Sequence, residues 1–228
     1  MNETSRATCV GIILDGNRRW AKARGLSKLE GHRVGLLETL RNTVRFVRAR
    51  GVKHLVVYMF STENWNRDKD EVAYLMDLFR ESIQKEMKEL GEEGVRVRFA
   101  GQRDRFSEDL QLAMDATEKE TAHNDAIALW CCLSYGGRAE IAAAARAAAG
   151  AREEITEESL ARHLWTAGMP DPDIIIRTGG EQRLSGFLPW QSVYSELFFI
   201  DAFWPDFDEK TFDAILAEFA TRERRRGK

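Results

Sequence analysis

The residues best suited to chemistry follow the first apolar run of the chain, residues 10–14. They are Asp15, Gly16, Asn17, Arg18, Arg19 and Trp20. A carboxylate beside two guanidinium groups suits a phosphate and a divalent metal held side by side, because guanidinium groups fork onto phosphate oxygens and hard cations prefer oxygen ligands. Gly16 lets the backbone approach a ligand, and Asn17 tolerates unusual dihedral angles. Taken alone, an Asp-Gly-Asn turn is more often a solvated surface turn, so its interpretation depends on the rest of the chain.

Positive charge gathers around this turn, although the chain as a whole is slightly acidic. The formal net charge is −3, which gives no bias toward nucleic acid or an anionic membrane. Between residues 15 and 33, however, six Lys and Arg side chains face only Asp15 and Glu30. We therefore expect a local site for an anion and no nucleic-acid partner.

Strand-like apolar runs alternate with helix-like segments along the chain. After residues 10–14, strands are predicted at 54–60, 95–100, 127–133, 173–176 and 197–200, and helices at 32–50, 70–90, 107–123, 139–149, 156–165 and 208–224. No linker or repeat interrupts this alternation. It predicts one α/β domain over residues 1–228, with a mainly parallel six-stranded sheet covered by helices on both faces.

The cysteines and the apolar runs bear on where the protein resides. Cys9, Cys131 and Cys132 form no Cys-x-x-Cys pair, and two of them lie inside an apolar run, so we expect reduced core residues. Residues 1–8 are polar and do not resemble a signal peptide, and no apolar run approaches the length of a membrane span. These features predict a cytoplasmic protein with at most peripheral membrane contact.

Four of the first five predicted strands end in turns rich in Gly, Asn, Ser or Arg. Because the carboxyl ends of parallel strands lie along one edge of a sheet, we expect Asp15 and the turns at 61–64, 135–138 and 177–180 to face one crevice. Basic and Gly-rich turns on one rim favour an anionic ligand.

These turns belong to five sequence blocks that together resemble the cis-prenyltransferase family. The blocks are residues 15–22 with 31–32, 60–67, 134–141, 173–183, and 190–196 with 204–207. Five blocks in family order over nearly the whole chain make a specific match. The Asp-Asp-x-x-Asp motif of the all-helical trans-prenyltransferases is absent from the sequence.

The resemblance implies a fold, a reaction and partners. The fold is a single α/β domain with a hydrophobic product tunnel, usually in a homodimer. The reaction condenses an allylic diphosphate, such as farnesyl diphosphate, with isopentenyl diphosphate and releases diphosphate, typically with Mg²⁺. The product is a Z-polyprenyl diphosphate, by this resemblance undecaprenyl diphosphate or a related chain.

The resemblance also assigns residues to the diphosphate that leaves. Asp15 is the catalytic aspartate and a metal ligand. The diphosphate-binding residues are Gly16, Asn17, Arg18, Arg19, Trp20, Lys28 and His32, with His32 expected at the start of the next helix. The sequence departs from the family twice, since Arg18 replaces a common glycine and Lys28 replaces a usual arginine. Lysine lacks the guanidinium fork, so we expect a looser contact there.

A second block corresponds to the loop over the reacting carbons. Its substrate-binding residues are Ser61, Thr62, Glu63, Trp65 and Arg67, and its catalytic residue is Asn64. An amide is a poor base, so we expect Asn64 to orient a water or a phosphate oxygen that takes the proton. Trp65 and Arg67 would close the loop over the substrate and exclude water.

The remaining assignments concern isopentenyl diphosphate and the tunnel. Arg177, Arg183, Leu184 and Ser185 match the isopentenyl diphosphate site, and Glu196 matches a second acidic metal position, while Gln182 replaces a histidine of some relatives. The apolar stripe within residues 72–90 fits a tunnel wall, although a stripe of this kind is more often plain core. Residues 225–227 resemble a family ending that reaches across the dimer, and a solvated basic tail is an equal alternative.

Two other functions compete with a catalytic prenyltransferase. One is a non-catalytic partner subunit, a class that loses the aspartate and arginines of the first block; here Asp15, Arg19, Asn64, Arg177 and Arg183 are all present. The other is an unrelated phosphate-binding enzyme such as a phosphatase, which would need a nucleophile or a second aspartate that the Asp-Gly-Asn turn does not supply.

Overall fold

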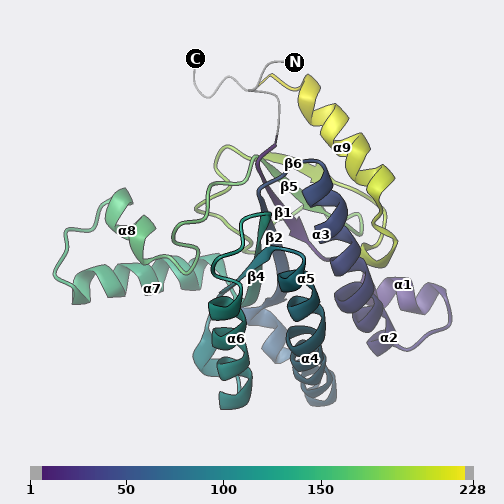
Figure 1. Ribbon diagram of the computed structural model, residues 1–228, viewed down its shortest axis with the longest axis horizontal. Coiled ribbons are helices and arrows are strands. Elements are labelled where there is room, and N and C mark those ends of the chain that lie inside the picture. The colour runs from purple at the N-terminus through teal and green to yellow at the C-terminus, as the bar shows by residue number, and fades with distance from the viewer. Residues whose placement is uncertain (1–6, 224–228) are drawn as a thin grey trace.

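Six parallel strands form one sheet at the centre of the computed structural model, which describes residues 7–223 (Figure 1). The strands are β1 (Cys9–Ile13), β2 (His54–Ser61), β3 (Val95–Ala100), β4 (Ile127–Tyr135), β5 (Ile174–Arg177) and β6 (Glu196–Phe199). Their order is β3-β4-β2-β1-β5-β6, and every neighbouring pair is parallel. The predicted sheet is confirmed.

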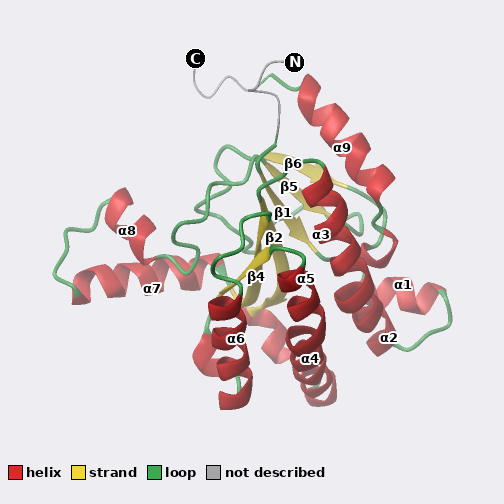
Figure 2. Ribbon diagram, in the orientation of Figure 1, coloured by secondary structure: helices red, strands yellow, loops and turns green. Residues whose placement is uncertain are grey.

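Helices lie beside the sheet where the sequence predicts them, and one further helix, α1, lies in a stretch for which no helix was predicted (Figure 2). They are α1 (Asn17–Ala23), α2 (Lys28–Arg33), α3 (Leu40–Ala49), α4 (Lys69–Ser82), α5 (Lys88–Glu92), α6 (Glu108–Glu120), α7 (Gly137–Gly150), α8 (Glu157–His163) and α9 (Glu209–Thr221). Short 3₁₀ turns occur at η3 (Thr62–Asn66), η5 (Arg103–Arg105) and η6 (Trp204–Asp206). The two long predicted helices each contain a π-helical turn, η2 (Val34–Thr39) between α2 and α3 and η4 (Ile83–Met87) between α4 and α5.

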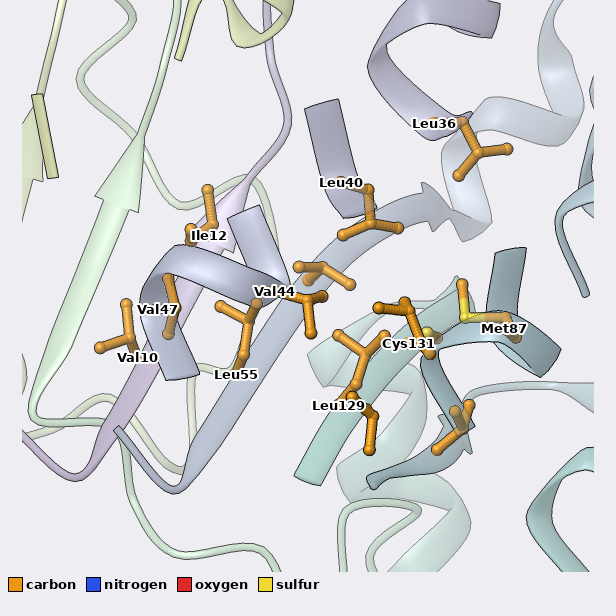
Figure 3. Packing of buried hydrophobic residues seen from close by; sticks show 14 of the residues in the cluster. Val10, Ile12, Leu36, Leu40, Val44, Val47, Leu55, Met87, Leu129 and Cys131 are labelled. Carbon is orange, nitrogen blue, oxygen red and sulfur yellow. The ribbon is translucent and has the colours of Figure 1, made fainter. Parts of the chain in front are cut away.

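The two faces of the sheet are covered differently. Val10 and Ile12 of β1 belong to a large apolar cluster with α3, α4, α6 and α9, where Figure 3 shows Val44 and Val47 of α3 among the strand side chains. Residues of β1 at alternate positions face the other side, where Phe187 and Leu188 of a non-helical segment complete a smaller cluster. The predicted helical layer on this second face is therefore replaced in large part by a loop, and α7 and α8 project outward from the body (Figure 1).

The apolar stripe of the long helix α4-η4-α5 is core. Leu75, Phe79, Ile83, Met87 and Leu90 are all buried in the large cluster. The hollow between this helix and η2 measures about 30 Å³, and it is lined by Leu36, Leu75, Leu78, Phe79 and other residues. A volume of this size holds one or two water molecules and no prenyl chain. In this structure the stripe packs as core, and its role as a tunnel wall stays a prediction.

The three cysteines lie in the core, as the sequence predicts. Cys9, Cys131 and Cys132 are buried, unpaired thiols, and burial raises the pKa of each. Within residues 7–223, no helix has both the length and the hydropathy to cross a bilayer. Residues 225–227, for which two roles were predicted, lie outside the described part of the chain.

Candidate active site

A cavity of about 800 Å³ opens beside the carboxyl end of β1, and its lining is rich in cations. This volume is typical of a small-molecule site. Its lining includes Asp15 together with the cationic or potentially cationic side chains of Arg18, Arg19, Lys22, Lys28, His32 and Arg67. These residues come from the turn after β1, from α1 and α2, and from the turn before α4, so the structure brings together most of the predicted diphosphate site. An anion with several oxygens is the ligand that such a lining favours.

Gly16 and Asn17 shape the turn at the end of β1. Gly16 has a φ of 104°, and a Cβ there would lie 2.6 Å from Cδ1 of Phe203, so the glycine is required by packing as well as by conformation. Asn17 begins α1, and its Nδ2 donates to the carbonyl of Leu14 at 3.3 Å. Its Oδ1 is buried and has no hydrogen-bond partner among the described residues.

Asp15 joins two groups of arginines. Its Oδ1 accepts a hydrogen bond from Nη2 of Arg19 at 3.2 Å on the cavity side. Its Oδ2 accepts from Nη2 of Arg177 at 2.9 Å, because the register of β1 and β5 places Ile13 beside Arg177. The Asp15 backbone is fixed by Thr178, whose hydroxyl accepts from the Asp15 amide at 2.9 Å and donates to its carbonyl at 2.7 Å.

The predicted isopentenyl diphosphate residues lie next to Arg177. Nη1 of Arg177 donates to Oγ of Ser185 at 2.8 Å and to the carbonyl of Arg183. The Arg183 side chain itself is exposed and paired with Glu181. Leu184 packs on the smaller apolar cluster. The structure therefore gathers this predicted group, with Arg177 buried at its centre.

The loop at 61–67 has a different internal arrangement from the one predicted. Asn64 accepts a hydrogen bond from the Ser61 amide at 3.0 Å and holds its own 3₁₀ turn. Nε1 of Trp65 donates to Oγ of Ser134 at 2.9 Å, and its ring packs against Phe60 and Phe106. In this structure the Trp65 ring packs against the apolar core, so closure over the substrate, which stays a prediction, would require the ring to move.

Other residues of the loop define the rim. Thr62 lies against Gly136, where an added Cβ would be 2.6 Å from the Thr62 hydroxyl, so the turns after β2 and β4 adjoin as expected. Glu63 is exposed. Of the loop residues predicted to bind substrate, Arg67 lines the cavity.

Trp20 does not face the cavity, and His32, which lines it, is not at the start of its helix. Nε1 of Trp20 donates to Oδ1 of Asp206 at 2.7 Å, and the Arg24 guanidinium stacks 4.4 Å from its ring, so Trp20 holds α1 against η6 instead of facing the cavity. His32 is the fifth residue of α2, which begins at Lys28, so the free N–H groups of the helix terminus are not near it. Burial, and then the nearby Arg67 charge, lower the pKa of His32 to about 4, which leaves the imidazole neutral at pH 7.

Glu71 is a residue of this site that the sequence did not single out. Its carboxylate is 2% exposed and lies behind the cavity wall. Lys28 Nζ is 2.8 Å from Oε2, and Arg67 Nη1 is 3.2 Å from Oε1. Burial opposes ionisation of Glu71, but the hydrogen bond from Lys28 and the charges of Arg18 and Arg67 outweigh it and lower its pKa. The spacing of Arg67 and Glu71, four residues apart at the start of a predicted helix, is the signal that could have found it.

In one copy of the protein, Glu196 and Asp15 lie at opposite edges of the sheet. It begins β6, at the amino edge of the sheet, whereas Asp15 follows the carboxyl end of β1. Its Oε2 accepts from Nη1 of Arg222 at 2.8 Å. Within one chain Glu196 therefore does not meet Asp15, and its role at a second metal position stays a prediction.

The donor set fits a magnesium ion only in a limited way. Among the described residues, no group of three or more His, Cys, Asp or Glu side chains could hold a metal. Asp15 is the carboxylate that lines the cavity, and its side chain is 28% exposed. Mg²⁺ commonly uses one or two carboxylates and completes its coordination with water and substrate phosphates. Asp15 fits that mode, provided that it separates from its arginine partners.

Comparisons with known proteins identify the family of the chain. Residues 13–227 match the family model described as putative undecaprenyl diphosphate synthase. The chain belongs to the cis-prenyltransferase family. It is 46% identical to an isoprenyl transferase of Neisseria gonorrhoeae over 220 residues, covering 96% of this chain and 88% of the relative. It is 45% identical to the isoprenyl transferase of Thermotoga maritima, covering 96% and 95% of the two chains.

The fold of this cis-prenyltransferase is also similar to those of solved structures. Lavandulyl diphosphate synthase of Lavandula x intermedia, in complex with dimethylallyl diphosphate, superposes with a TM-score of 0.93 at 32% identity, covering 99% of this chain and 100% of the other. A probable undecaprenyl diphosphate synthase of Campylobacter jejuni gives 0.84 at 29% identity, with both chains fully covered. The protein is a prenyl transferase.

Proposed function

We propose that this prenyl transferase condenses an allylic diphosphate with isopentenyl diphosphate, forms a Z-polyprenyl diphosphate and releases diphosphate. The observation that carries the proposal is the position of Asp15 between Arg19 on the cavity side and Arg177 beside Ser185. Two cationic groups on either side of one carboxylate suit two diphosphates that must meet.

In this proposal each group holds one substrate. Arg18, Arg19 and Lys28 bind the diphosphate that leaves, and Arg177 with Ser185 binds the one that stays. The Asn64 turn adjoins this rim and orients a proton acceptor there. Asp15 holds Mg²⁺, which supplies charge neutralisation on the leaving diphosphate when bound. Because Asp15 is paired with both arginines in the free protein, the diphosphates must draw those arginines away before Asp15 is free.

We propose farnesyl diphosphate as the allylic substrate, with undecaprenyl diphosphate or a related chain as product. A long product requires the helices beside the 30 Å³ hollow to move apart. Dimethylallyl diphosphate is a second candidate substrate, with a short product. The small hollow favours it, as does the similarity to lavandulyl diphosphate synthase, which was crystallised with that compound.

We also propose a cytoplasmic homodimer with at most peripheral membrane contact. Val193 and Tyr194 are 70% and 66% exposed, and Leu197 on the edge strand β6 is 36% exposed. An apolar surface beside an unpaired strand edge suits a second copy of the chain. Light scattering after size-exclusion chromatography tests the dimer, and a monomeric mass at micromolar concentration would contradict it.

The test of the reaction uses the full chain with Mg²⁺ and radiolabelled isopentenyl diphosphate. Farnesyl and dimethylallyl diphosphate are supplied in separate reactions, and the butanol-extractable product is weighed by mass spectrometry. Label in that fraction supports the proposal, and the product mass decides between the long and the short chain. Absence of label with both substrates would refute it and leave a non-catalytic subunit or a phosphatase.

A further inference from the structure

Glu71 has three close neighbours, and all three line the cavity that Glu71 itself does not reach. They are Lys28 at 2.8 Å, Arg67 at 3.2 Å and His32 at 3.4 Å. Lys28 and His32 belong to α2, and Arg67 precedes α4. One buried carboxylate therefore ties together two separate walls of the anion cavity.

The side chains of Lys28 and Arg67 lie between the buried Glu71 carboxylate and the open cavity. The side chains of Lys28 and Arg67 are 43% and 28% exposed, while that of Glu71 is 2% exposed. Burial lowers the pKa of Arg67, so its guanidinium gains from a nearby anion. The His32 imidazole is neutral at pH 7 and adds no charge, and its Nε2 has no hydrogen-bond partner in the described chain.

We propose that Glu71 is a positioning residue that exchanges Lys28 and Arg67 with diphosphate. The carboxylate holds both cations in the free protein, gives them up in part when diphosphate enters the cavity, and takes them back when diphosphate leaves. It competes with the ligand for the same donors, so it weakens diphosphate binding and speeds release. This inference rests on the proposed function, in which diphosphate is the leaving group.

Removal of the Glu71 charge should tighten diphosphate binding, because the carboxylate competes with diphosphate for the same cations. Glu71→Gln keeps the size and the acceptor oxygen of the side chain but removes its charge, so Lys28 and Arg67 remain beside the cavity with no competing carboxylate. We expect the Kd for inorganic diphosphate to fall about tenfold, as for loss of one partly screened charge a few ångströms away. The dissociation rate of diphosphate should fall by a similar factor.

The measurement is calorimetric titration of the full chain with inorganic diphosphate, together with the KM and kcat for the allylic substrate. A tighter Kd and a lower KM support the exchange. An unchanged or weaker Kd would overturn it, because a merely structural Glu71 would weaken binding when replaced.

Two further variants, one a control and one a second test, accompany Glu71→Gln. Glu81→Gln, ten residues further on α4, removes a half-exposed carboxylate paired with Arg33 at 3.0 Å, and its Kd should equal that of the wild type. Glu71→Asp keeps the charge but shortens the reach by one methylene, so we expect a roughly threefold tightening from the weakened grip on both cations. It tests the inference even if Glu71→Gln does not fold, and a Kd at or above the wild-type value would contradict the exchange.

The experiments distinguish failure of the Glu71 exchange from failure of the proposed prenyl transfer. Diphosphate binding that responds to Glu71→Gln in a protein that transfers no prenyl group would refute the reaction and support the exchange. Prenyl transfer with a Kd unaffected by Glu71→Gln would do the reverse. A wild-type chain that does not bind inorganic diphosphate would overturn the exchange directly.

Discussion

Glu71 and Glu140 are both buried glutamates in the first turn of a helix, yet their surroundings are opposite. Glu71 begins α4, and cations of the cavity wall surround it. Glu140 begins α7 and is fully buried among neutral donors. Its Oε1 accepts from the amide and the hydroxyl of Thr166 at 3.0 and 2.8 Å, and its Oε2 accepts from Nε2 of Gln191 at 3.1 Å and from the Tyr135 hydroxyl.

The difference shows how partners decide the role of a buried carboxylate. The donors around Glu140 are themselves buried, and Gln191 Nε2 also donates to Thr166 Oγ1 at 2.6 Å within the same cluster. The cluster therefore ties α7 to the segments at 166 and 191 in one arrangement. Burial, and then the Glu140 charge, raise the pKa of Tyr135, which keeps its hydroxyl a donor. Lys28 and Arg67, the donors around Glu71, line an open cavity and can bind another anion there. Glu140 is thus expected to govern stability, and the cavity cluster to govern activity.

The largest expected effect falls on stability at Glu140. Glu140→Ala leaves the Thr166 amide, the Thr166 hydroxyl and the Tyr135 hydroxyl without an acceptor, and Gln191 keeps only Thr166, so the free energy of unfolding should fall by about 4 kcal/mol. Urea denaturation followed by circular dichroism measures it. Glu157→Ala, at an exposed first-turn position of α8, is the control and should cost less than about 1 kcal/mol. A loss no greater than the control's would remove the contrast with Glu71.

In contrast to Glu140→Ala, Asp15→Ala should lower activity and leave stability nearly unchanged. We expect turnover to fall at least about a hundredfold with the fold intact, because an electrostatic group at the leaving diphosphate is lost. Steady-state assays with the preferred allylic substrate measure turnover, and circular dichroism checks the fold. Nearly normal turnover would remove the metal role from Asp15.

His32 should make stability depend on pH. Its pKa of about 4 in the folded protein lies below the ordinary value of 6.5, so the unfolded chain binds the proton more readily. Stability is therefore full above about pH 6.5 and falls as the pH drops toward 4, by about 3 kcal/mol. His32→Gln should flatten urea-derived stabilities over this window. The exposed His123→Gln should leave the slope unchanged, and equal slopes in both variants would contradict the assignment.

The smallest effect is expected for Lys28→Arg. A guanidinium can fork onto a phosphate while retaining Glu71, so the Kd for inorganic diphosphate should be equal to that of the wild type or up to about threefold tighter. Titration calorimetry measures this, with the exposed Lys85→Arg as a control. A clearly weaker Kd would show that the shape of Lys28, and not its charge alone, is required.

Much of the architecture could be predicted because the signals are local. Apolar runs and the turns that end them predict the strands, and parallel order then places Asp15, Thr62 and Gly136 on one rim. The directions of the tryptophans could not be predicted in this way. Trp20 bonds to Asp206 and Trp65 to Ser134, partners distant in sequence, so packing and not local pattern decides where each ring points.

By itself, the sequence determined the parallel sheet and the position of Asp15 at the end of its first strand, because periodicity and turn residues act over a few neighbouring positions. Only the tertiary structure decided which charges meet. The register of β1 against β5 brings Arg177 to Asp15, and the packing of α2 beside the start of α4 brings Lys28 to Glu71. These contacts join residues far apart in the chain, and such residues become neighbours only when the sheet and its helices are assembled.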